Sequence, residues 1–394
     1  MPKPIPVHGT CDARFAAVRD LFARGFSERR EIGAAVSFSL DGETVVDLWG
    51  GHVDRERTRE WERDTLVNVY STTKGMTAIC AHQLVERGEL DLDAPVARYW
   101  PEFAAAGKAE IPVRWLLSHR AGLAAPRRTL SPDELFAWDP FVAALAEQEP
   151  WWEPGTRHGY HALTFGHLVG ELIRRVSGQS IGAFFRENVA DPLDADFHIG
   201  LAPEHDARTS DLHGSIAPPR ENGAKFKGPL ADFLRDMSDP TTMAGAAFGN
   251  PRFEPGLVNT RAWRAAEIPA ANGHGTARAL ARIYGALARG GEVDGVRLLA
   301  PESIERAIQE QAIGPDAVLG GMPMRYGLGF MLRQDFMPLS PSERAFGHPG
   351  AGGSIGMADP DARVGFGFTM NRMQMGLVGS AGAFAMIGAF FEAL

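Results

Sequence analysis

The sequence contains only 2 cysteines in 394 residues, and it has no cluster of basic side chains. Cys11 and Cys80 are too few for a disulfide framework, and Cys80 falls in a segment with the composition of a buried helix. The net charge of −9 argues against nucleic acid as a partner. The first residues also lack the apolar stretch of a secretory signal. These absences together predict a cytoplasmic protein.

Long uncharged runs are also scarce, and one alone reaches the length of a membrane span. It extends from Met373 to Phe391 and contains four glycines. Phe384, Ile387 and Phe391 follow helical spacing within it. A transmembrane helix is the alternative, but we expect a C-terminal helix packed on a sheet and no membrane association.

Segments with strand character stand at both ends of the chain. Residues 33–40 and 44–49 flank Asp41-Gly42, which is typical of an antiparallel hairpin. Three more strands are predicted at 326–332, 353–358 and 363–370. An N-terminal helix is predicted because one apolar face would contain Phe15, Val18, Leu21, Phe22 and Phe26. Two more helices are predicted in the middle of the chain, at 163–176 and 276–288.

This order predicts an α/β (α+β) fold. An antiparallel sheet from residues 1–68 and 295–394 would be flanked by helices, with a mainly helical domain, residues 69–294, inserted between its halves. Within that domain, residues 201–272 are rich in Pro, Gly, Asp and Asn. Such a long irregular stretch is usually functional, and we expect it to shape substrate preference.

The most informative motif is Ser71-Thr72-Thr73-Lys74. Residues at i and i+3 of a helix are neighbours, so the hydroxyl of Ser71 and the amine of Lys74 can form a hydrogen bond. A serine needs such a base to act as a nucleophile, and burial would lower the pKa of the lysine enough for it to serve. The backbone N–H of Ser71, at a helix start, is also free to bind an oxyanion. The alternative is an N-cap serine followed by a lysine that extends to the surface.

Two further segments could complete such a site. Tyr160 lies on a loop before a helix and could share a proton with a serine–lysine pair, although a core tyrosine is the alternative. Residues 346–354, Phe-Gly-His-Pro-Gly-Ala-Gly-Gly-Ser, contain glycines that would let a strand edge approach a substrate closely. The alternative is a glycine-rich turn that enters a strand.

In this order, the three elements resemble the serine β-lactamase and penicillin-binding superfamily, most closely class C β-lactamases and family VIII carboxylesterases. The resemblance extends from the hairpin at Gly33 to the last helix, and residues 116–123 are similar to the family's LLxHxxGL segment. It implies that Ser71 is the acylated nucleophile and that Lys74 and Tyr160 accept and return its proton. The backbone N–H groups of Ser71 and Ala351 would form the oxyanion hole.

Two departures from the family pattern concern the substrate. The family's Tyr-x-Asn box reads Tyr160-His161-Ala162, without the amide that holds a β-lactam side chain. The Lys-Thr-Gly box reads His348-Pro349-Gly350, so an imidazole that is mostly neutral at pH 7 replaces a fixed positive charge. We expect His348 and Gly350 to contact the substrate, and β-lactams and peptidoglycan to be poor substrates.

Other chemistries find less support in the sequence. Gly352-Gly353-Ser354-Ile355-Gly356 fits the nucleophile elbow of α/β-hydrolases, but no histidine follows Ser354 to complete a triad. His158 and His161 do not belong to a metal-binding pattern, so no metal and no cofactor are expected.

The sequence therefore predicts a carboxylesterase that hydrolyses small or medium-chain esters through an acyl-serine. Its partner would be a small-molecule ester, and the oligomeric state stays open. The alternatives are a β-lactamase or D-amino-peptide hydrolase, an acyltransferase that uses the same serine, and a non-catalytic binding protein of the same fold.

Overall fold

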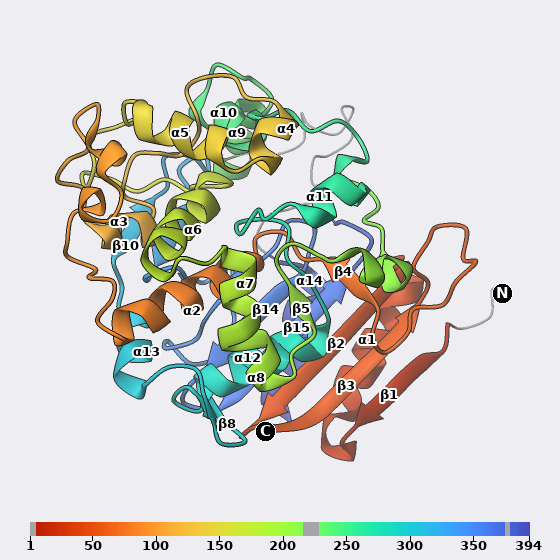
Figure 1. Ribbon diagram of the computed structural model, residues 1–394. Helices are drawn as coiled ribbons and strands as arrows, with labels where there is room; N and C mark the ends of the chain where they lie inside the picture. The colour runs from red at the N-terminus through yellow and green to blue at the C-terminus, as the bar shows by residue number, and fades with distance from the viewer. Residues whose placement is uncertain (1–4, 216–227, 375–378) are drawn as a thin grey trace.

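The computed structural model describes residues 5–215, 228–374 and 379–394 (Figure 1). Within these ranges a nine-stranded antiparallel sheet has the order β1-β3-β2-β15-β14-β13-β12-β11-β10. Its strands are β1 Val7–Cys11, β2 Gly33–Leu40, β3 Glu43–Gly51, β10 Ala312–Pro315, β11 Pro323–Tyr326, β12 Met331–Leu332, β13 Phe346–Pro349, β14 Ile355–Asp359 and β15 Val364–Met370. Strands from both ends of the chain thus form one sheet, as the sequence predicted.

The remaining elements are mainly helical. A small sheet contains β4 Leu66–Asn68, β5 Phe197–His198, β6 Thr209–Ser210 and β7 His274–Gly275, and β8 Glu292–Val293 pairs with β9 Val296–Arg297. The helices are α1 Ala16–Glu28, α2 Thr73–Glu86, α3 Val113–Leu117, α4 Pro132–Phe136, α5 Asp139–Glu147, α6 Thr164–Ser177, α7 Ile181–Phe185, α8 Asp191–Leu193, α9 Pro229–Met237, α10 Met243–Gly249, α11 Arg261–Ala265, α12 Ala277–Ala288, α13 Pro301–Ile308 and α14 Ala381–Glu392.

The alternation of side chains along β15 explains how helices cover both faces of the sheet. Successive residues of a strand point to opposite faces. Phe366 and Phe368 belong to the core that contains α1 and α14, where the ring of Phe390 stacks on that of Phe38 with centroids 4.2 Å apart. Gly365 and Gly367 instead let α12 approach the other face, because a Cβ at either position would meet helix backbone atoms within 2.5 Å.

Two sequence expectations need comment here. The strand predicted at 326–332 is wrong in its middle: β11 ends at Tyr326 and β12 begins at Met331, because Gly329 has φ +90° and the chain turns there. Helix α12 lies inside the segment assigned to the helical domain, yet it packs on the sheet. The two-domain division stays a prediction.

The second half of the uncharged C-terminal run forms α14, which packs on the sheet as expected. Residues 375–378 of this run lie outside the described part of the chain. In the described part, no helix has both the length and the apolar character that crossing a bilayer demands.

Candidate active site

Ser71 lies in a tight turn between β4 and α2, two residues before the helix begins. Tyr70, directly before it, has φ +44°, a left-handed conformation that is uncommon for a non-glycine residue and that turns the chain sharply. The N–H of Thr72 donates to the carbonyl of Val69 (3.2 Å), and the N–H of Lys74 donates to the carbonyl of Ser71 (3.0 Å). These bonds hold Ser71 at the entrance to the helix that carries Lys74.

Lys74 is fully buried, and its amine is held by oxygen atoms alone. Nζ donates to the hydroxyl of Ser71 (3.2 Å), to the carbonyl of Ala162 (2.7 Å) and to the carbonyl of Ala270 (3.0 Å). No carboxylate forms an ion pair with it among the described residues. Burial therefore lowers the pKa of Lys74 well below its usual range. A lower pKa makes it easier for this amine to lose a proton and so to act as a base toward Ser71.

Tyr160 completes the group of three residues that the sequence singled out. Nζ of Lys74 lies 4.8 Å from the centroid of its ring. Burial raises the pKa of Tyr160, and a hydrogen bond with Ser71 acts in the opposite direction. Because burial is the larger effect, Tyr160 stays a neutral phenol that can donate a proton.

The glycine-rich segment packs directly against the turn of Ser71. Its Ser354 hydroxyl donates to the carbonyl of Val69 (2.7 Å), and the N–H of Gly350 donates to the carbonyl of Ser354 (2.7 Å). Ala351 and Ser71 both line one cavity. Ser354 is thus buried behind the turn, in contact with backbone, and does not occupy the position of an elbow nucleophile.

His348 and Gly350 lie behind this wall and not among the residues that line the cavity. The imidazole of His348 is buried, with Nδ1 2.7 Å from the carbonyl of Pro349 and Nε2 without a hydrogen-bond partner. Burial lowers the pKa of His348 to about 3, so its ring is neutral. A substrate contact for these two residues stays a prediction.

The cavity in front of Ser71 has a volume of about 600 Å³, within the range of small-molecule sites. Its lining is mainly apolar and comes largely from described residues between positions 201 and 272, a region that contains α9, α10 and α11. Arg55 and Glu254 are the charged residues of the described lining. The large apolar side chains on its walls are Leu163, Leu212, Met237, Phe248, Phe253, Val258 and Met373.

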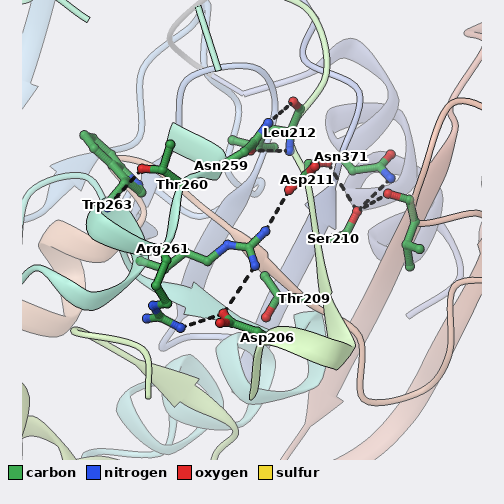
Figure 2. Close-up of polar contacts among 12 residues, drawn as sticks. Asp206, Thr209, Ser210, Asp211, Leu212, Asn259, Thr260, Arg261, Trp263 and Asn371 are labelled. Carbon is green, nitrogen blue, oxygen red and sulfur yellow. Dashed lines mark hydrogen bonds and ion pairs between the residues drawn. The ribbon is translucent and has the colours of Figure 1, made fainter. Parts of the chain in front are cut away.

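One wall of the cavity is fixed by a network of polar side chains (Figure 2). Asn259 accepts a hydrogen bond from the N–H of Leu212 and donates one to its carbonyl, both at 2.9 Å. Arg264 joins Asp206 and Asp211 by ion pairs of 3.3 and 2.7 Å. Side-chain hydrogen bonds and ion pairs therefore hold together the two segments that meet in this wall.

Sequence reasoning missed several residues that build the site. The carbonyls of Ala162 and Ala270 hold the lysine, but backbone acceptors leave no signal in a sequence. Asp316, on the loop after β10, accepts a hydrogen bond from the N–H of Tyr160 (3.1 Å) although the two residues are distant in the chain. In the described residues, no group of three or more His, Cys, Asp or Glu side chains is arranged to hold a metal ion.

A serine in a tight turn, a fully buried lysine within hydrogen-bond distance of it and a neighbouring tyrosine, in a chain with a large antiparallel sheet flanked by helices, indicate a serine hydrolase of the β-lactamase fold. The chain belongs to the beta-lactamase family, whose model matches residues 18–386. It is 39% identical to the "Esterase/beta-lactamase LipL" of Mycobacterium tuberculosis, over 94% of this chain and 84% of that protein.

Solved structures agree with this assignment. A family VIII carboxylesterase superimposes with a TM-score of 0.90 at 41% identity, over 99% of this chain and 100% of the other. A penicillin-binding protein homologue from Caulobacter crescentus superimposes with a TM-score of 0.89 at 39% identity, with the same coverage.

Proposed function

We propose that this protein is a carboxylesterase that hydrolyses small and medium-chain esters with an apolar acyl or alcohol group. The observation that carries the proposal is the buried amine of Lys74, 3.2 Å from the hydroxyl of Ser71, at an apolar cavity of about 600 Å³. A neutral amine at this distance can take up the serine proton as the oxygen attacks a carbonyl carbon. The names of two relatives, an esterase/beta-lactamase and a carboxylesterase, support the same chemistry.

In the proposed reaction, the three side chains act in turn. Ser71 Oγ bonds to the ester carbonyl carbon, and its proton passes to Nζ of Lys74. The oxyanion is stabilised by the backbone N–H groups of Ser71 and Ala351. The C–O bond to the alcohol then breaks, and the alcohol oxygen receives a proton from Tyr160, which Lys74 reprotonates. Water, deprotonated in the same way, releases the acid and restores Ser71.

A β-lactamase activity is the second candidate, because the relative from Mycobacterium tuberculosis carries both activities in its name. The absence of a fixed cation at His348 argues for weak binding of the β-lactam carboxylate. Arg55 is the one arginine or lysine on the described cavity lining. We therefore expect nitrocefin to be a much poorer substrate than a neutral ester.

Labelling with a fluorophosphonate, followed by peptide mapping, tests the proposal together with turnover of p-nitrophenyl butyrate and nitrocefin. We expect label on Ser71, ester turnover, and a loss of about 10⁴-fold or more in kcat for Ser71→Ala. Added alcohols would reveal transfer of the acyl group to an acceptor other than water. Nitrocefin turnover equal to ester turnover would favour the β-lactamase, and an active Ser71→Ala variant would overturn the mechanism.

A further inference from the structure

Asp316 is a fully buried carboxylate that no described arginine or lysine pairs with. Four donors surround it instead. Oδ1 accepts from the N–H groups of Tyr160 (3.1 Å), Val318 (2.8 Å) and Leu319 (2.9 Å), and Oδ2 accepts from the hydroxyl of Tyr326 (2.9 Å). Burying a carboxylate without a cation is costly unless hydrogen bonds compensate for the lost hydration, as these four do in part. Such a group needs a reason to be there.

The segment that carries Tyr160 depends on external contacts for its position. Residues 157–161 have no regular secondary structure. On one side, the N–H of Gly159 donates to the carbonyl of His119 (3.0 Å). On the other side, the loop of Asp316 provides two bonds: its carboxylate receives the N–H of Tyr160, and the N–H of Ala317 donates to the carbonyl of His158 (3.1 Å). The loop after β10 thus fixes the backbone of Tyr160.

The same carboxylate also supports the ring of Tyr160 through a second route. It holds the hydroxyl of Tyr326, whose ring packs edge-on against His119 with centroids 4.7 Å apart. His119 in turn packs against the ring of Tyr160 at 5.1 Å. Both the backbone and the ring of Tyr160 are therefore connected to one side chain.

We propose that Asp316 is a positioning residue that fixes Tyr160 against Ser71 and Lys74 for proton transfer. This inference rests on the proton-transfer role proposed above for Tyr160. Rates of proton transfer fall steeply with misplacement, so a shift of the Tyr160 segment reduces kcat more than it affects KM. Asp316 itself lies off the described cavity lining.

A double-mutant cycle between Asp316→Ala and Tyr160→Phe tests the proposal. The measured quantity is kcat for each active site, counted by fluorophosphonate titration, so that unfolded protein does not contribute. If Asp316 acts through Tyr160, Asp316→Ala costs about 10- to 100-fold in kcat in the parent and less than about twofold in the Tyr160→Phe background. Asp316→Asn keeps an oxygen for the N–H groups and should restore most of the lost rate.

Glu171→Ala is the matched control, because Glu171 is also fully buried and accepts hydrogen bonds from Trp138, Arg174 and Arg175. It should lower stability without changing kcat for each active site. Equal losses from Asp316→Ala in both backgrounds, or no loss in either, would overturn the role of Asp316. A Tyr160→Phe variant as active as the parent would instead overturn the role of Tyr160. If Asp316→Ala does not fold, the cycle is run with Asp316→Asn, which should show a smaller loss that again vanishes without the Tyr160 hydroxyl.

Discussion

The hydroxyl of Ser354 donates a hydrogen bond of 2.7 Å to the carbonyl of Val69, two residues before Ser71. A second contact, 3.2 Å long, joins the hydroxyls of Ser354 and Thr72. The serine that fits an elbow motif in the sequence is therefore part of the support of the candidate nucleophile. This gives the glycine-rich segment a structural task next to the site.

Replacement of Ser354 by alanine should leave the chemistry in place. We expect the variant to lose about 1 kcal/mol of stability, because the carbonyl of Val69 loses one of its two hydrogen bonds and keeps that from Thr72, and to lose less than about tenfold in kcat. Ser37→Ala is the control, since Ser37 is also buried and donates one bond to the carbonyl of Val46 (3.0 Å). Denaturant unfolding and peptide mapping of the labelled protein measure both effects. Loss of label from Ser71 in the Ser354 variant would contradict this account.

Gly350→Ala should disrupt the hydrogen bond between Ser354 and Val69, because the added methyl group would collide with both partners. A Cβ at this position would lie 2.1 Å from the carbonyl oxygen of Val69 and 2.2 Å from the hydroxyl of Ser354. Because backbone cannot move aside cheaply, we expect a loss of about 3 kcal/mol or more, together with loss of ester turnover. Gly388→Ala has open space around it in α14 and should stabilise the protein by up to about 1 kcal/mol. Equal stability of the two variants, measured by thermal unfolding, would show that the close approach is not needed.

Glu31 should make stability depend on pH near neutrality. Burial raises its pKa from 4.5 to about 7, although Arg29, Arg372 and a hydrogen bond from Gln374 oppose the shift. Because the folded pKa is the higher one, the folded protein retains a proton that the unfolded chain loses. Stability is thus full below pH 4.5 and falls as the pH rises through 7.

Glu31→Gln should remove this dependence. At pH 8 we expect the variant to be more stable than the parent by up to about 3 kcal/mol, and at pH 4 the two should agree. Glu392→Gln changes the net charge equally at an exposed position and should have little effect. Urea unfolding between these pH values gives the comparison. Parallel stability curves for parent and Glu31→Gln would contradict a raised pKa.

Asn259 should influence which esters fit the cavity. Its amide holds both backbone groups of Leu212, and both residues line the cavity. Asn259→Ala should loosen this wall and change the ratio of kcat/KM for butyrate and acetate esters by about tenfold. Asn188→Ala removes bonds to Phe184 and Arg87 away from the cavity and should leave the ratio unchanged. If the ratio of kcat/KM for the two esters is unchanged in both variants, residues on other walls of the cavity determine the selectivity.

The part of the site that is local in sequence could be predicted, and the part that depends on distant segments could not. Ser71 and Lys74 are three residues apart, so the local geometry of a turn that enters a helix is enough to bring them together. Tyr160 was identified from the order of the three motifs along the chain, which can be read from a single sequence. Asp316 and Asn259 gave no signal, because each binds the backbone of a residue that is distant in the sequence. For Asp316 that residue is Tyr160, and for Asn259 it is Leu212.

The same reasoning applies to the fold. Residues 33–40 and 44–49 have strand character and flank an Asp-Gly turn. The hairpin that they predict is formed by β2 and β3. The pairing of β2 with β15 could be expected only in outline, since register depends on contacts between the ends of the chain. The interruption between β11 and β12 was missed because apolar residues on either side of Gly327 and Gly329 resemble a continuous strand.

Contacts between residues far apart in the sequence also bear on when the site can form during translation. The N–H of Gly33 binds the side chain of Asn371, 338 residues later, and the turn of Ser71 is held by Ser354, 285 residues after Val69. A ribosome therefore releases Ser71 long before it releases Ser354. Because such non-local contacts form only after the intervening chain exists, the nascent polypeptide carries Ser71 without a working site. We therefore expect the turn of Ser71 to gain its full support only after the segment with Ser354 has been synthesised.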